Sequence, residues 1–261
     1  MYDCKKNAIK DIFKKHGLIN SFSPEKIVSI INNFDFEIGH RKYYFDEHIF
    51  DRVDTPDKAY CIGLFMADGC NQLEYNSFNI ELQERDKDIL DKIQIMFQSD
   101  YPLHFRDMRN TKNMAQNTYK ITYFCKYFCE RLNELGIIPR KSLSLEFPKW
   151  IPNKLIPFLI KGYIDGDGWV RKDNIGFMST YDFCLGTQKF LDSIGIKSKI
   201  MDLKKNYNEN TKILYLNGRN NMIPLAEIMF SHGNLYIERK YQKYLEYGFL
   251  NNNIINNSQS A

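Results

Sequence analysis

No stretch of the sequence approaches the roughly 18 uninterrupted apolar residues that a membrane-spanning helix requires. The N-terminal segment, MYDCKKNAIKDIFKK, lacks the apolar core of a signal peptide. We therefore expect a soluble protein that has no membrane partner and meets its ligands in water.

Cysteine is scarce, and the six cysteines include no C-x-x-C pair. Cys125 and Cys129 have the spacing of neighbours on one helix face, which does not suit a cysteine-type zinc site. The sequence favours reduced thiols in a reducing compartment.

A strong excess of charge of one sign is also missing. Lysine and arginine number 36 against 32 acidic residues, so the net charge of +4 is compatible with a polyanionic partner without requiring one. With 261 residues and 43% hydrophobic content, the chain exceeds the usual size of one domain and has room for two similar units.

Residues 1–52 are predicted to form a small N-terminal helical extension. AIKDIFKKHG and SFSPEKIVSIINNF have the pattern of two short amphipathic helices, the second with Ser23 as N-cap and Pro24 at its first position. A helix-turn-helix that touches DNA and an extension that only packs against the rest of the chain both remain open.

Beyond this extension, residues 54–69 predict one largely buried helix. It is followed by the alternating strand SFNIELQ, the helix DKDILDKIQIMF, the strand YKITYF and the helix CKYFCERLNELG. The same order returns between NKLIPFLIKGYIDGDG and NMIPLAEIMFSHG.

Two landmarks give this repeat one spacing. Asp68 and its following glycine recur at Asp167, and Lys141 with its preceding arginine recurs at Lys240, both after 99 residues. We predict an internal duplication. The expected units are the extension 1–52, half-domains over 53–148 and 149–250, and a disordered polar tail over 251–261.

The first helix of each half carries a stripe of minimal side chains, Gly63 with Ala67 and Gly162 with Gly166. Glycine inside a helix costs about 0.5 to 1 kcal/mol relative to alanine, so a compensating gain is expected. We infer that these two helices pack closely against each other.

Each of these helices ends in an aspartate, where the last carbonyl groups repel a carboxylate. If the helices are adjacent, Asp68 and Asp167 converge and raise each other's pKa unless a cation lies between them. Oxygen ligands of this kind suit Mg²⁺ or Mn²⁺. A single A-D-G or G-D-G would be explained by a helix-terminal turn, but two copies on matching helices favour a metal site.

CIGLFMADG at 61–69 and IKGYIDGDG at 160–168 resemble the two signature helices of single-chain LAGLIDADG homing endonucleases, and the likeness covers about residues 54–248. The resemblance implies an α+β fold of two pseudo-twofold related αββαββα half-domains, whose antiparallel sheets form a saddle along the major groove of DNA. The first motif departs from the family's pattern by carrying Met66 where the second has Asp165.

The resemblance also implies a set of active-site residues. The metal ligands would be Asp68 and Asp167, assisted by the backbone carbonyls of Ala67, which replaces a glycine of the motif, and Gly166. The further catalytic candidates are the lysines Lys141 and Lys240 and the polar strand residues Gln83 and Ser179.

Residues predicted to face outward from the strands are the candidate DNA contacts, some to phosphates and a minority to base edges. In the first half these are Asn79, Glu81, Lys120 and Thr122, and in the second half Arg171, Lys172, Lys199, Lys204, Lys205 and Lys212.

Together these features predict a monomeric, metal-dependent endonuclease that cuts both strands of a long, specific DNA site. A group I intron RNA maturase on the same scaffold, with intron RNA as partner, and a non-catalytic DNA-binding regulator are the alternatives. An intein is disfavoured, because residue 1 is not a nucleophile and the chain ends in Ser-Ala.

Overall fold

The computed structural model describes residues 42–107, 116–203 and 209–251. The predicted N-terminal helices and the predicted disordered tail, except residue 251, lie outside these ranges, as do Lys204 and Lys205. From Tyr44 onward the described residues belong to one compact unit, whose range includes both predicted half-domains.

Each half of this unit has the order αββαββα, which confirms the predicted fold class. The first half consists of α3 (Pro56–Asp68), β1 (Gly69–Gln72), β2 (Ser77–Gln83), α4 (Lys87–Met96), β3 (His104–Arg106), β4 (Thr118–Phe124) and α5 (Lys126–Glu134). The second consists of α6 (Ile156–Asp167), β5 (Gly168–Val170), β6 (Asn174–Thr180), α7 (Tyr181–Ser193), β7 (Lys199–Asp202), β8 (Thr211–Asn217) and α8 (Arg219–Met229), with α9 (Glu238–Glu246) added after it.

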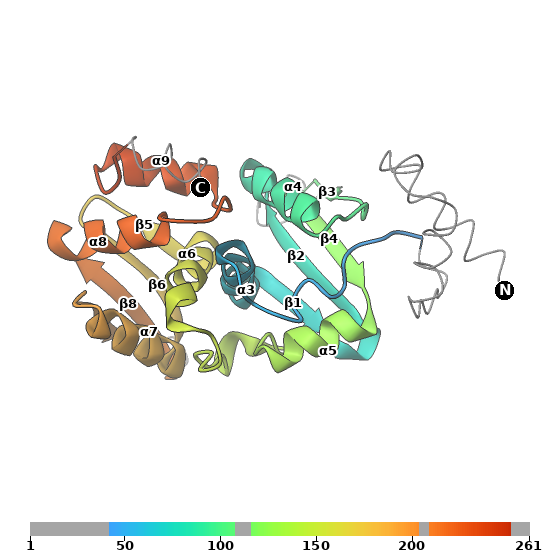
Figure 1. The fold of residues 1–261 in the computed structure, drawn as a ribbon, viewed down its shortest axis with the longest axis horizontal. Coiled ribbons are helices and arrows are strands. Elements are labelled where there is room, and N and C mark those ends of the chain that lie inside the picture. Colours follow the sequence, from blue (N-terminus) through green and yellow to red (C-terminus); the bar gives the residue numbers. More distant parts are fainter. Residues whose placement is uncertain (1–41, 108–115, 204–208, 252–261) are drawn as a thin grey trace, which may run out of the picture. The chain divides into compact units, whose positions relative to one another are not determined.

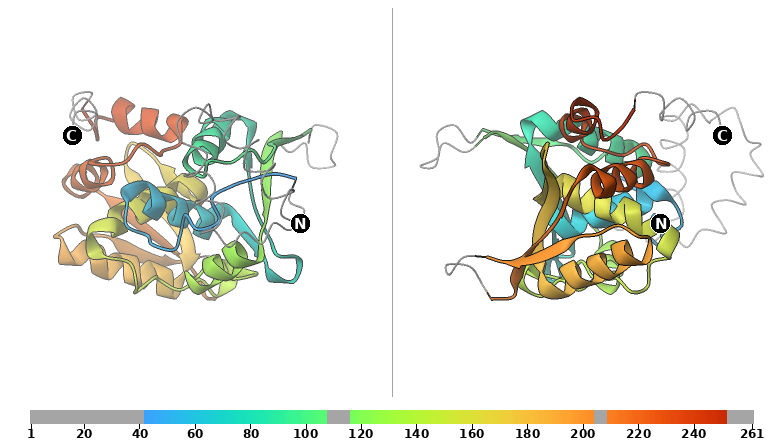
Figure 2. Two further views of the ribbon diagram at one scale, coloured as in Figure 1. Left: turned by 45° about the vertical axis from the view of Figure 1, so that its right-hand side comes forward. Right: turned by 90° about the vertical axis from the view of Figure 1, so that its left-hand side faces the viewer.

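The two sheets are antiparallel and have equivalent strand orders, β1-β2-β4-β3 and β5-β6-β8-β7. The helices lie on one side of both sheets (Figure 2). Apolar strand residues such as Ile80 and Phe177 point to that side, where they are buried. The polar residues that alternate with Phe78, Ile80 and Leu82 along β2 therefore face the uncovered side of the first sheet.

Helices α3 and α6 lie side by side between the sheets (Figure 1). A Cβ atom on Gly63 would collide with the backbone carbonyl of Leu159, and one on Gly162 would collide with that of Tyr60. The two glycines thus bring the helix backbones into direct contact, which explains the apolar helices' tolerance of glycine in their interiors.

Strands β1, β3 and β5 and helix α9 were not located from the sequence pattern. Strand β3 has three exposed residues and no apolar alternation, and α9 begins after Ile237 without a side-chain cap. No helix among the described residues is both long enough and apolar enough to cross a membrane.

Candidate metal and nucleic-acid site

Asp68 and Asp167 are the last residues of α3 and α6, and the packing of these helices brings their ends together. A Cβ atom on Gly166 would lie 2.7 Å from Oδ2 of Asp68 and would also collide with Ala67. The carboxylate of one helix therefore lies against the last turn of the other.

Both carboxyl groups lie in surroundings that disfavour their charge. Burial first, and then the charge of Asp167, raises the pKa of Asp68 to about 7, against the smaller opposing effects of Lys240 and Lys141. Desolvation also raises the pKa of Asp167, although part of its surface remains exposed to solvent. A cation shared by the two groups would relieve both effects.

Lys240 binds the C-terminal end of α6. Its buried Nζ donates hydrogen bonds to the carbonyls of Ile164 at 2.6 Å, Asp165 at 2.7 Å and Gly168 at 2.8 Å. Burial lowers the pKa of Lys240 to about 8, while the Asp165 carboxylate opposes this change. The ammonium thus adds a hydrogen-bond donor to the carbonyls at the end of α6 and counters the negative end of the helix dipole.

Lys141 has the equivalent position in the first half with fewer contacts. Its Nζ donates to the carbonyl of Gly69, and burial lowers its pKa while the charges of Asp167 and Asp68 raise it. Both lysines predicted as catalytic therefore lie beside the two aspartates and bind backbone carbonyls at the helix ends.

Asp165 is fully buried between three elements. Its Oδ2 accepts hydrogen bonds from the hydroxyl of Tyr60 on α3 at 2.8 Å and from the backbone N–H of Ile237, just before α9, at 2.9 Å. Burial raises the pKa of Asp165. The acid of the second motif thus ties both central helices to the segment that carries Lys240, a link that Met66 cannot supply in the first half.

An ion pair that was not predicted joins a partly exposed arginine of one half to a buried aspartate of the other. Arg239 donates from Nε and Nη2 to the two carboxylate oxygens of Asp86, at 2.7 and 2.8 Å, and Asp86 is 3% exposed. Arg239 belongs to the repeated Arg-Lys pair, so the repeat pointed to this residue but not to its role. Its first-half counterpart, Arg140, is exposed, and no feature of the sequence pointed to Asp86 as the partner.

The two predicted polar strand residues have different positions. Gln83 faces outward, and its buried Oε1 has no hydrogen-bond partner among the described residues. Ser179 lies on the helix-covered side, where its Oγ accepts from the Tyr163 hydroxyl at 2.9 Å. The prediction for Ser179 is one residue out of register. Gly69 pairs with Ile80 and Gly168 pairs with Phe177 in the two sheets, so the counterpart of Gln83 is Thr180.

The hydroxyl of Thr180 already makes two hydrogen bonds. Its Oγ1 accepts from the N–H of Phe183 as the N-cap of α7 and donates to the Leu145 carbonyl. The second half therefore has no free polar side chain at the position of Gln83.

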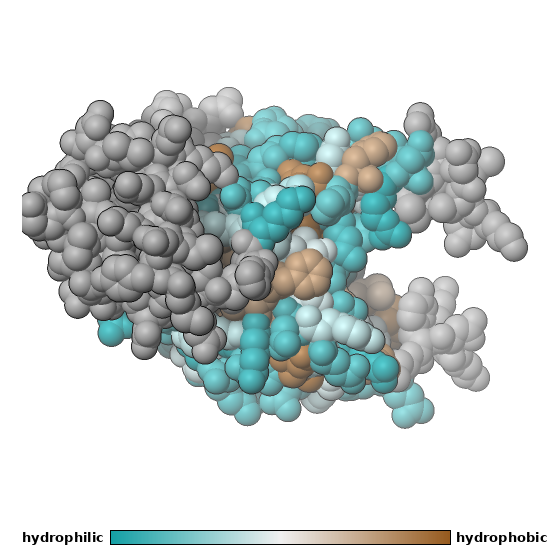
Figure 3. All heavy atoms as spheres, turned by 90° about the vertical axis from the view of Figure 1, so that its right-hand side faces the viewer, coloured by the Kyte–Doolittle hydropathy of each residue, from teal (hydrophilic) through white to brown (hydrophobic). Residues whose placement is uncertain are grey.

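Some of the candidate DNA contacts face outward from the sheets as predicted, and one does not. Asn79, Glu81, Lys120 and Thr122 share the outward face of the first sheet, because each pairs in register with another member of the set. The end of the compact unit that carries β4 and β3 is mainly hydrophilic, with scattered apolar residues (Figure 3).

In the second half Arg171, Lys172 and Lys199 are exposed. The prediction that Lys212 faces outward is wrong, because it pairs with Ser179 on the other face of the sheet. Its Nζ is bound to Asp202 and to the Glu209 carbonyl, each at 2.7 Å.

Among the described residues, no group of three or more His, Cys, Asp or Glu side chains could hold a metal ion. The carboxylates at the touching ends of α3 and α6 are those of Asp68 and Asp167.

Comparison with known proteins finds a family model that matches within the second half. Residues 158–229 match the model of the LAGLIDADG-like domain, which confirms the predicted resemblance. The chain is also 31% identical over 185 residues, 66% of its length, to the probable translation initiation factor IF-2 of Methanocaldococcus jannaschii, and it spans 15% of that protein.

Three solved structures are similar in fold. Full-length DUF199/WhiA from Thermatoga maritima has a TM-score of 0.47 and 13% identity, with 81% of this chain and 68% of that chain covered. The meganuclease I-SmaMI bound to DNA has a TM-score of 0.49 and 11% identity, with 73% of this chain and 88% of that chain covered. I-DmoI in complex with DNA and Ca has a TM-score of 0.48 and 12% identity, with 72% of this chain and 96% of that chain covered.

Proposed function

We propose that this chain, which contains a LAGLIDADG-like domain, is a monomeric, site-specific double-strand DNA endonuclease of the homing type. The observation that carries the proposal is the convergence of two desolvated aspartates at the touching ends of α3 and α6. Two carboxylates held together in this way repel each other, and each has a raised pKa. A divalent cation bound between them would offset this repulsion.

The donor set fits a hard cation. Asp68 and Asp167 supply carboxylate oxygens, and Ala67 and Gly166 supply backbone carbonyls, a combination that suits Mg²⁺ or Mn²⁺. When bound, such ions activate water and stabilise the charge that develops on a phosphodiester during hydrolysis.

The remaining residues of the site position these groups. Lys141 and Lys240 hold the helix ends, and Asp165 fixes α6 against α3, so the aspartates are supported by a buried network. The partly exposed Asp167 leaves one side of the pair accessible. The outward faces of the two sheets would hold a DNA duplex, with Gln83 beside it in the first half.

The decisive test changes each aspartate to its uncharged isostere. We expect Asp68→Asn and Asp167→Asn each to reduce double-strand cleavage at least about a hundredfold in Mg²⁺, because each removes charge needed by the transition state. A randomised duplex pool first supplies a cleaved site, and binding to that site is measured in Ca²⁺. The exposed Asp192→Asn variant on α7 is the matched control and should cut normally.

Full cleavage by either active-site variant contradicts the assignment. If no duplex in the pool is cut, the nuclease proposal fails. Mg²⁺-dependent promotion of group I intron splicing that survives both substitutions would then support the maturase, and binding without cleavage would support a regulator.

A further inference from the structure

In one row of equivalent positions, the outward faces of the two sheets have opposite chemistry. The row across β2, β4 and β3 in the first sheet is Glu81, Lys120 and His104. The row across β6, β8 and β7 in the second sheet is Met178, Ile213 and Met201. Equivalent positions in two copies of one fold therefore carry charged and ionisable groups in one half and only apolar side chains in the other.

The first sheet's row belongs to a polar network. Glu81 accepts two hydrogen bonds from Arg106, at 2.8 and 2.6 Å, and one from the Thr118 hydroxyl at 2.6 Å. Phe124, at the end of β4, is the apolar exception on this face. Side chains of this kind suit the hydrogen-bonding edges of bases.

The second sheet extends its apolar row with Trp169, two residues after Asp167. Its indole lies against Gly176, where a Cβ atom would come within 2.8 Å of the ring, and Tyr215 borders the other side of that glycine. The indole N–H donates to Asn174 at 2.5 Å, and the Arg171 guanidinium lies 5.6 Å from the ring. Since its only donor is in use, Trp169 presents apolar surface to an incoming ligand.

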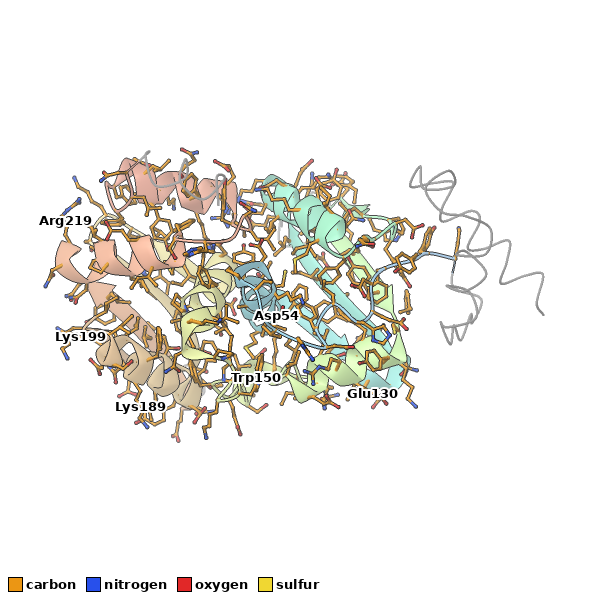
Figure 4. The ribbon with its side chains drawn as sticks, in the orientation of Figure 1. Asp54, Glu130, Trp150, Lys189, Lys199 and Arg219 are labelled. Atoms are coloured by element: carbon orange, nitrogen blue, oxygen red, sulfur yellow. The ribbon has the colours of Figure 1, made fainter. Side chains whose placement is uncertain are left out.

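This apolar surface faces solvent. Met201 is 47% exposed, and the other members are partly exposed, because the helices described in the structure lie on the opposite side of the sheet (Figure 2). Basic residues lie around it, with Arg171 and Lys172 in the β5–β6 turn and Lys199 at the outer margin of the second half (Figure 4). An exposed apolar patch surrounded by basic residues suits a polyanionic ligand that displays apolar groups between its charged groups.

Resting on the proposed function, we infer that the second sheet recognises its half of the DNA site by apolar contact with thymine methyl groups, whereas the first sheet reads hydrogen-bonding edges. Methionine and isoleucine side chains cannot donate to or accept from base edges as amides and charged groups do. The thymine C5-methyl is the apolar feature that the major groove displays. The β5 strand that starts this surface follows Asp167 directly, so the surface is continuous with the cleavage site.

Replacing thymine by deoxyuridine tests this inference, because it removes only the methyl group. A site is selected from the randomised pool, and affinity in Ca²⁺ is measured with uridine placed in one half-site at a time. We expect about fourfold weaker binding per contacted methyl in the half read by the second sheet, the effect of losing one buried methyl-sized group. Less than about twofold change is expected in the other half.

Protein variants assign the half-sites. Lys120→Gln should change base preference only in the half read by the first sheet and leave the uridine effect intact. Met201→Gln, at an exposed position, and the nearly isosteric Ile213→Thr should each reduce the uridine effect in the opposite half toward onefold.

The outcomes separate this inference from the proposed function. If no duplex is bound or cut, the proposed function itself fails. Cleavage with equal uridine effects in both halves, or unchanged selectivity in Met201→Gln and Ile213→Thr, overturns the methyl readout alone and assigns the apolar surface to another partner, such as a protein.

Discussion

Lys161 is a charged side chain enclosed almost completely within an aromatic cage in the second motif helix. It is 1% exposed, and its Nζ lies 5.0 Å from the ring centre of Phe230, 5.5 Å from that of Tyr60 and 5.6 Å from that of Phe158. Burial lowers its pKa to about 8, against the opposing charges of Asp165 and Asp57. Cation–π contact offsets part of the desolvation cost, and the rest is a cost to folding.

The lowered pKa predicts a pH-dependent effect of Lys161→Met. Between about pH 8 and 10.5 the unfolded chain holds a proton on Lys161 that the folded chain has released, so the wild type gains stability as the pH rises through this window. Methionine fills the cage without charge. We expect the variant to be more stable than the wild type by about 1 kcal/mol or more at pH 7, and its advantage to shrink by pH 9.5.

Urea unfolding at the two pH values measures this difference. Lys189→Ala, an exposed change on α7 (Figure 4), is the control and should show no such pH dependence. An advantage of Lys161→Met that is constant with pH would contradict the assignment.

At the scale of elements, the contact between α4 and α9 is the clearest example of stability that depends on one pair. Asp86 precedes α4 and is nearly inaccessible, so removal of its partner leaves a buried carboxylate without compensation. We expect Arg239→Ala to lower the free energy of unfolding by about 3 kcal/mol.

The exposed pair Asp192–Lys197 supplies a matched comparison within the same chain. Both side chains are largely solvated, so Lys197→Ala should change stability by less than about 0.5 kcal/mol. Equal effects of the two substitutions in chemical denaturation would show that Asp86 is hydrated or neutral without Arg239.

Elements with regular apolar spacing were predictable from the sequence, and those without it were not. The alternation of β2 and β4 and the apolar stretches of α3 and α6 reflect burial on one face or all round. In α9 only three residues are buried, one of which is Lys240, so there is little apolar pattern to detect.

The same reasoning explains the site predictions. Asp68 and Asp167 were singled out because their placement at helix ends conflicts with local stability, and the structure brings the two residues together. The Ser179 position failed because strand register depends on pairing, and a shift of one residue moves a side chain to the opposite face.

At the scale of the whole molecule, the two halves have the same order of helices and strands but differ in their buried charged groups. The second half carries the buried group of Asp165, Lys161 and Lys240, whereas the first has Met66 and the less extensively bonded Lys141. The charge of Asp167 nevertheless raises the pKa of Asp68 across the boundary between the halves. Metal binding by the pair therefore tests whether the two halves act together.

Metal binding should therefore stabilise the folded chain. A cation that binds only the folded state and relieves the repulsion between Asp68 and Asp167 adds about 2.7 kcal/mol at a concentration one hundred times its Kd. We expect millimolar Mn²⁺ to raise Tm in the wild type and to have little effect on Tm in the Asp68→Asn, Asp167→Asn double variant. Differential scanning calorimetry with and without EDTA measures both, and equal shifts would place the ion elsewhere.

The backbone contact at Gly63 and Gly162 has a consequence for how the protein can change over generations. No side chain lies between the two helices at these positions, so main-chain dimensions fix the interval between their acidic ends. In the proposed enzyme, mutations on the sheets can select new base pairs while the offset between the two strand breaks, and with it the overhang that repair must process, is inherited unchanged.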